Sequence, residues 1–130
     1  MQATATAKFV RYTPRKVNQV LSLIRGKSVI KAAEILAFLP KSAATVIDKV
    51  LKSAVANSGS LKDISSYTVK EAWVGSGTTL KRMRPGPQGR GMPIKKRMAH
   101  LTVVVTDEVP IVVKKKKKEV SGTKIIKAGK

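Results

Sequence analysis

Residues 78–106 read TTLKRMRPGPQGRGMPIKKRMAHLTVVVT, and this stretch decides the fold. Its last six residues alternate Leu or Val with Thr or Val, which is the pattern of a half-buried β-strand. Its middle, residues 84–91, is rich in Gly and Pro and is typical of a turn. The segments on either side of that turn are too long for an ordinary hairpin loop of about 2–5 residues. We therefore predict one long β-hairpin, over about residues 78–98, whose strands leave the sheet and project from it.

The first strand of this hairpin begins upstream. We expect residues 67–74 to form a strand that pairs antiparallel with residues 101–106, and a third strand over residues 3–11, where Ala3, Ala5, Ala7 and Phe9 share a face. Within 67–74, two sets of residues alternate: Tyr67, Val69, Glu71 and Trp73 against Thr68, Lys70, Ala72 and Val74.

A helix is predicted directly after the first strand. Thr13 and Pro14 suit its N-cap and first position, because Thr can accept a hydrogen bond there and Pro lacks an N–H that would go unpaired. Gly26 ends it in a left-handed cap. The residues at helical spacing that face the core are Val17, Val20, Leu21 and Ile24.

Two more helices are predicted before the second strand. A short one follows Ser28 and stops at Pro40, since proline cannot continue a helix. A longer one covers about residues 41–57. The short helix contains the apolar residues Ile30, Ala33, Ala37 and Phe38, and the long one carries the stripe Val46, Ile47, Val50, Leu51, Ala54 and Val55.

Basic charge is concentrated in two parts of the chain. The net charge is +20, far above the magnitude of roughly 2–8 that a small domain needs to stay in solution. Residues 61–79 balance to zero, whereas residues 80–100 hold seven Lys and Arg with no acid. We expect one domain over residues 1–113, followed by a disordered Lys-rich tail, residues 114–130. The excess charge indicates a polyanionic partner, with nucleic acid as the first candidate and an anionic membrane surface as the second.

Several classes of protein are disfavoured. The chain has no Cys, hence no disulfide or thiolate metal site, and no apolar stretch near the ~18 residues of a membrane span. No signal peptide is visible. We find no paired carboxylates, no nucleophile with a base and no phosphate loop, and we expect His100 to be an ordinary strand residue. The prediction is a protein without catalytic residues, cofactor or metal.

A basic hairpin without a core of its own is marginal in water, and its like charges repel. Phosphate backbone neutralises such charges, and Arg can bridge phosphates and stack on bases. The apolar residues between the cations, such as Met83 and Ile94, suit an arm packed into RNA better than a solvated loop. We expect Trp73, Tyr67 and Tyr12 to lie in the core or at a sheet edge rather than to stack on bases.

Two other functions stay open at this point. An architectural DNA-binding protein would insert an apolar wedge, here Pro85 or Pro87, into the minor groove. Duplex DNA that competed equally with RNA would favour it. An RNA-modifying enzyme would need a catalytic constellation that the sequence lacks, and turnover on RNA would be its sign.

Four stretches occur in an order and spacing that together resemble one family. They are TPRKV with LIRGK (13–17, 23–27), VLKSAVAN (50–57), LKRMRP with GR (80–85, 89–90) and IKKR with HLTVVV (94–97, 100–105). Over about residues 4–108 the chain resembles the L-twenty-two (uL-twenty-two) family of large-subunit ribosomal proteins. It departs from that family at Gly86-Pro87-Gln88, where the tip is usually more basic, and in the Lys-rich tail beyond Val113.

The resemblance implies an α+β fold of three helices on a three-stranded antiparallel sheet with a projecting hairpin. It implies a structural constituent of the large subunit that binds large-subunit ribosomal RNA, aids assembly and contacts neighbouring large-subunit proteins. The hairpin would line the exit tunnel beside the nascent peptide, on a cytoplasmic ribosome or, alternatively, an organellar one. No membrane is implied.

The expected site residues follow from the charge pattern and the resemblance together. The expected RNA-binding residues are Arg11, Arg15, Lys16, Arg25, Lys27, Lys81, Arg82, Arg84, Arg90, Lys95, Lys96 and Arg97. The resemblance further implies a region linked to the tunnel and to macrolide sensitivity, formed by Leu80, Lys81, Arg82, Met83, Arg84 and Arg90.

Overall fold

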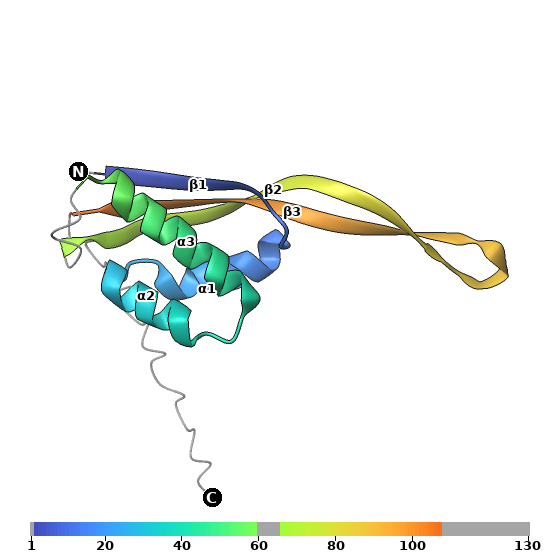
Figure 1. Cartoon of the computed structure of the whole chain (residues 1–130), viewed down its shortest axis with the longest axis horizontal. Coiled ribbons are helices and arrows are strands. Elements are labelled where there is room, and N and C mark those ends of the chain that lie inside the picture. The colour runs from blue at the N-terminus through green and yellow to red at the C-terminus, as the bar shows by residue number, and fades with distance from the viewer. Residues whose placement is uncertain (1, 60–65, 108–130) are drawn as a thin grey trace, which may run out of the picture.

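Three helices pack on one side of a three-stranded antiparallel sheet, from which two strands run on as a long arm (Figure 1). The computed structural model describes residues 2–59 and 66–107. The predicted α+β class is confirmed, while the predicted tail, 114–130, lies outside the described residues. The elements are β1 (Gln2–Val10), α1 (Pro14–Ile24), α2 (Val29–Phe38), α3 (Ser42–Asn57), β2 (Thr68–Pro85) and β3 (Gly91–Thr106).

Strand β3 is the centre of the sheet. The strand order is β1-β3-β2, so β3 pairs antiparallel with both edge strands. Thr106 is opposite Gln2 on one side and Thr68 on the other. The predicted pairing of residues 67–74 with 101–106 is confirmed, with Trp73 opposite Thr102.

Helix α1 buries the apolar stripe that the sequence predicts, and those four side chains are at most 1% exposed. Its start is set by Pro14, which follows Thr13 in extended conformation. Gly26 has φ +71°, a left-handed conformation that favours glycine, and its N–H donates to the carbonyl of Val69 at 2.9 Å. The helix is thereby fastened to β2, the strand that leads into the arm.

Helix α2 buries other residues than the four apolar ones singled out from the sequence. Val29, Ala32 and Leu36 lie in the core, whereas Ile30 and Phe38 are exposed, Phe38 at 87%. The 3.6-residue period places the three buried residues on one side of α2, and the helix packs against α3.

A β-bulge breaks the predicted alternation of β2. Between Val69 and Glu71 the strand gains one residue relative to β3, so Lys70 has no direct partner. The alternation therefore reverses after the bulge. Ala72 enters the core with Val69, and Trp73 and Glu71 are exposed.

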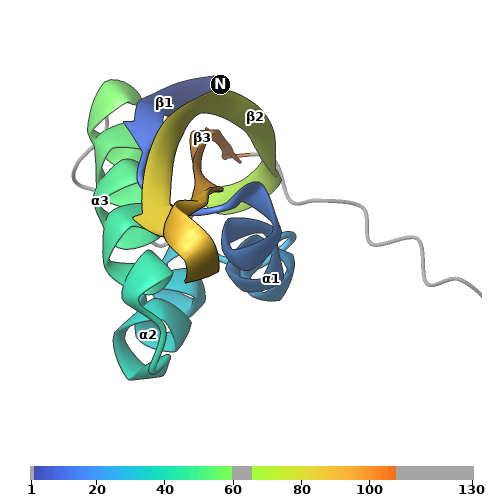
Figure 2. The same cartoon turned by 90° about the vertical axis from the view of Figure 1, so that its right-hand side faces the viewer.

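Two further bulges mark the root of the arm. One lies in β1 between Ala7 and Val10, and the other in β2 between Ser76 and Thr79; both face residues 97–101 of β3. Beyond them β1 has ended, and β2 and β3 continue as a two-stranded ribbon that twists away from the body (Figures 1 and 2).

The ribbon pairs as far as Pro85 and Gly91, so its turn is shorter than the 84–91 stretch expected from the sequence. A short 3₁₀ turn (Pro87–Gly89) forms the tip. The N–H of Gly86 donates to the carbonyl of Arg90 at 2.8 Å, and a Cβ on Gly86 would lie 2.9 Å from that oxygen. This close approach requires glycine at position 86.

Candidate RNA interface at the root of the hairpin

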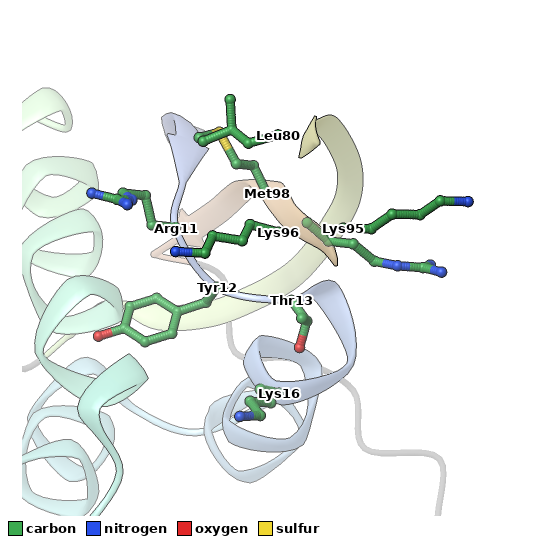
Figure 3. A pocket seen from close by; sticks show the side chains of 9 residues that line it. Arg11, Tyr12, Thr13, Lys16, Leu80, Lys95, Lys96 and Met98 are labelled. Atoms are coloured by element: carbon green, nitrogen blue, oxygen red, sulfur yellow. The ribbon is translucent and has the colours of Figure 1, made fainter. Parts of the chain in front are cut away.

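Five basic residues gather in a groove between the root of the hairpin and the loop that joins β1 to α1. The groove has a volume of about 260 Å³. Figure 3 shows Lys96 extending to the same side as Arg11 and Tyr12, while Lys95 points the opposite way. We call it the root groove; its lining residues are Arg11, Tyr12, Thr13, Lys16, Leu80, Lys95, Lys96, Arg97 and Met98.

The root groove joins predicted residues that are distant in the sequence. Arg11 and Lys16 flank the start of α1, whereas Lys95, Lys96 and Arg97 belong to β3. The β1 bulge turns the chain away from the sheet directly before Arg11. Tyr12 anchors this turn, since its hydroxyl donates to the carbonyl of Ser42 at 3.1 Å.

The start of α1 adds to the positive potential of the root groove. Arg15 and Lys16 occupy its first turn, which contains no acid and has no side-chain cap, while the N–H groups of Lys16 and Val17 donate to the carbonyl of Thr13. Cations at a helix N-terminus oppose the helix dipole and cost stability. An anion at that end would relieve the repulsion, because both the dipole and the two cations attract it.

The ribbon beyond the root groove carries cations on both faces. Residues directly opposite in an antiparallel ladder share a face. One face pairs each cation with an apolar residue: Lys96 with Leu80, Arg82 with Ile94 and Arg84 with Met92. The other places Lys81 directly opposite Lys95. With Arg90 at the tip, the predicted hairpin cations are all exposed.

A second hollow, of about 320 Å³, lies on the other side of α1. It contains two further predicted residues, Arg15 and Arg25, which sequence reasoning did not connect to Trp73. The guanidinium of Arg25 donates from Nε to the carbonyl of Ala72 (2.7 Å) and from Nη2 to Oδ1 of Asn18 (2.8 Å). We call it the Trp73 hollow; its lining residues are Pro14, Arg15, Asn18, Arg25, Trp73 and Val74.

The remaining predicted residue, Lys27, is exposed in the turn after α1 and lines neither hollow. The sequence reasoning missed Lys41, whose Nζ donates to Oε1 of Gln19 at 3.1 Å beside Tyr12 and Lys16. Only its positive charge could have drawn attention to it.

Three other features were sought in the part of the chain that the structure describes: a reactive histidine, a metal site and a membrane-spanning helix. His100 is a strand residue, as predicted: its Nδ1 accepts the N–H of Phe9 at 3.1 Å, and the two rings meet edge to face. Residues 2–59 and 66–107 contain no cluster of three or more His, Asp or Glu that could hold a metal ion. Within the same residues no helix is both long and apolar enough to cross a bilayer.

Comparison with known proteins accounts for most of the chain. Residues 5–106 match the family model described as ribosomal protein L22p/L17e. Proteins named large ribosomal subunit protein uL22 are similar over 82–83% of this chain. The one from Endomicrobium trichonymphae is 67% identical and covered over 93% of its length. Those from Clostridium acetobutylicum (52%) and Oceanobacillus iheyensis (51%) are covered over 98% and 97% of theirs.

The match covers the three helices, the whole hairpin and the sheet except for the first three residues of β1, and it ends at the last residue of β3. The relatives are structural proteins of the ribosome and not enzymes. The chain belongs to the ribosomal protein L22p/L17e family and is therefore a structural protein of the large ribosomal subunit.

Proposed function

We propose that this protein binds large-subunit ribosomal RNA through the root groove and the hairpin, and that it aids assembly of the subunit beside neighbouring proteins in the cytoplasm. The observation that carries the proposal is the unbroken basic character of the arm. Between Glu71 and Asp107 the sequence contains no acid, and the described cations of that stretch all lie on the ribbon or in the root groove.

Length and shape support a role for the hairpin inside RNA. From the Thr79–Arg97 pair to the Pro85–Gly91 pair the ribbon advances about 20 Å, at ~3.3 Å per residue. The side chains of this part are exposed except for a half-buried Leu80, and at its base Leu80, Lys95, Lys96 and Arg97 share the root groove with the loop between β1 and α1. A slender ribbon with charge on both faces can be surrounded by phosphates on all sides.

We further propose that the ribbon extends along the nascent-peptide exit tunnel and that its exposed apolar side chains contact the peptide. Met83 is 79% exposed near the tip, and Met92 is 51% exposed. A photo-crosslinker at position 83 should capture a stalled nascent peptide in reconstituted ribosomes. The same crosslinker at Lys52, on α3, should not, and equal capture from both positions would contradict the proposal.

Shortening the ribbon tests the proposed RNA binding. Replacing residues 81–95 with Asn-Gly joins Leu80 to its partner Lys96 by a hairpin turn and removes Lys81, Arg82, Arg84, Arg90 and Lys95. We expect the same thermal unfolding, weaker binding to bacterial large-subunit ribosomal RNA, and a shallower dependence of affinity on salt. Unchanged affinity would overturn the proposal, and unfolding would show that the arm belongs to the core.

A truncation after Val113 provides the matched comparison. It removes eight lysines, more cations than the shortened ribbon loses. We nevertheless expect the smaller loss of RNA affinity, because the proposal assigns RNA binding to the ribbon and the root groove. A complete loss on truncation would assign binding to the tail. Duplex DNA that competed equally with the RNA would instead favour an architectural DNA-binding protein.

A further inference from the structure

Trp73 lies in an unusual place for the single tryptophan of the chain. It is 47% exposed, on edge strand β2, because the bulge at Lys70 reverses the alternation of the strand. A large aromatic surface is therefore open to another molecule, and its surroundings decide which kind of molecule suits it.

The surroundings of Trp73 are basic. Arg15 and Arg25 line its hollow with Asn18, Pro14 and Val74, and none of the lining residues is acidic. The other exposed phenyl rings differ. Phe38 lies in a hollow with Glu34 and Asp48, and Phe9 is partnered by His100.

Arg25 gives the Trp73 hollow a fixed wall. Its two hydrogen bonds, to Ala72 and to Asn18, hold the guanidinium against β2, the strand that carries Trp73. Arg15 makes no such bond within the described residues, and it is exposed. The hollow therefore combines an aromatic surface, a held cation and a second cation that can pair with a ligand.

The Trp73 hollow and the root groove are neighbours along one helix. Arg15 lines the first and Lys16 the second, so consecutive residues at the start of α1 serve both. A strand of RNA whose phosphates lie in the root groove would pass the start of α1 and reach the hollow within a few nucleotides.

We propose that the Trp73 hollow binds an unpaired nucleobase of the RNA, stacked on the indole ring, with Arg15 beside the adjoining phosphate. The site rests on the proposed RNA binding and deepens it. Stacking suits this surface because every base has an aromatic face, and a base in a cationic hollow brings its own anion. An acidic peptide would use the two arginines but would not need the indole.

Trp73 itself reports on the site, since its emission can be excited without that of tyrosine. We would titrate the full-length protein with bacterial large-subunit ribosomal RNA, with single-stranded oligoadenylate, and with an abasic oligomer of equal length and charge. RNA affinity is followed separately by anisotropy of a labelled RNA. We expect ribosomal RNA and oligoadenylate to quench the emission and protect it from acrylamide, and the abasic oligomer to do neither.

Substitutions separate stacking from a structural role. Trp73→Ala and Trp73→Leu should weaken oligoadenylate binding by about 5- to 100-fold, and Trp73→Phe by less, because Phe still stacks. Phe38→Ala, which removes an exposed ring that lies beside Glu34 and Asp48, should leave the affinity for oligoadenylate unchanged. Unaltered thermal unfolding of the Trp73 variants shows that the fold is retained.

The outcomes distinguish the two proposals. If labelled ribosomal RNA binds while Trp73 emission and acrylamide access stay unchanged, the base site is wrong and RNA binding stands. Equal quenching by the abasic oligomer would reduce the site to a phosphate contact and would likewise overturn stacking. If the wild-type protein fails to bind RNA at all, the proposed function fails first.

Discussion

Lys81 and Lys95 lie directly opposite each other across the two strands of the hairpin, on the same face of the ribbon. Like charges at opposed positions destabilise an antiparallel pair. The described residues provide no acid on the ribbon to offset this repulsion. The free ribbon is therefore less stable than it would be with an attractive pair at these two positions. The repulsion is relieved when an anion binds between the two lysines.

Replacing one of these lysines should have opposite effects on the free arm and on binding. We expect Lys81→Glu to stabilise the free ribbon by about 0.2–1 kcal/mol, because an attractive pair replaces a repulsive one, and to weaken RNA binding. Hydrogen exchange of the amides of residues 79–84 measures the first effect, and a filter-binding titration measures the second.

The double variant Lys81→Glu/Lys95→Glu is the control for that pair. It restores like charges, so the slower hydrogen exchange should be lost again while RNA binding falls further. Slower exchange in the double variant would show that removing lysine, and not the pairing of charges, stabilises the arm.

The root groove predicts a second charge effect. Arg11→Gln, Lys16→Gln and Lys96→Gln together remove three of its cations, and the slope of log affinity against log salt should fall by up to about 0.9 for each phosphate that the variant no longer neutralises. The matched control carries Lys31→Gln, Lys49→Gln and Lys52→Gln on α2 and α3, none of which lines either hollow. An equal fall in both triple variants would mean that only total charge matters.

Arg25 should act on stability more than Arg15 does. Arg25→Ala removes the hydrogen bond that joins the end of α1 to Ala72 of β2, together with a second bond to Asn18 within α1, at a cost of about 1–2 kcal/mol in the free energy of unfolding. Arg15→Ala should change that free energy by less than about 0.5 kcal/mol. Urea unfolding measures both. A larger loss from Arg15→Ala would contradict the structural role given to Arg25.

The contact between Phe9 and His100 holds the β1 bulge. Phe9 has φ 56°, a conformation that is rare outside glycine, and its N–H donates to His100. His100→Ala should lower the free energy of unfolding by about 1–2 kcal/mol, since it removes that acceptor and the ring contact. Thermal unfolding measures the change. Thr102→Ala, which loses only an exposed hydroxyl bond to Thr6, should cost clearly less.

The helices and the hairpin could be predicted because their signals are local. Pro14 and Gly26 bracket α1, and the spacing of Val17, Val20, Leu21 and Ile24 fixes its buried face. The bulge at Lys70 could not be predicted in this way. No glycine or proline marks it, and only the register with β3 shows that one residue is left over.

The sequence predicts which cations belong to the candidate site, but it does not predict which of them lie together in one groove. Arg11 and Arg97 are far apart in sequence, and the bulges that bring them to one groove depend on long-range pairing. For the same reason charge alone could not separate Arg25, which donates two bonds within the body, from Arg15. For Trp73 the sequence provides only the residue type, and a tryptophan is as readily predicted to be buried as to be exposed.

The order of the strands also determines when this protein can fold during its synthesis. Because β3 is central, β1 and β2 have no partner until residues 91–106 have been made. Gln2 then pairs with Thr106 across nearly the whole domain. Contacts so distant in sequence close slowly, and the waiting edge strands are open to wrong partners. A chain still attached to the ribosome that makes it therefore has no complete sheet for its helices to pack on until its last strand emerges.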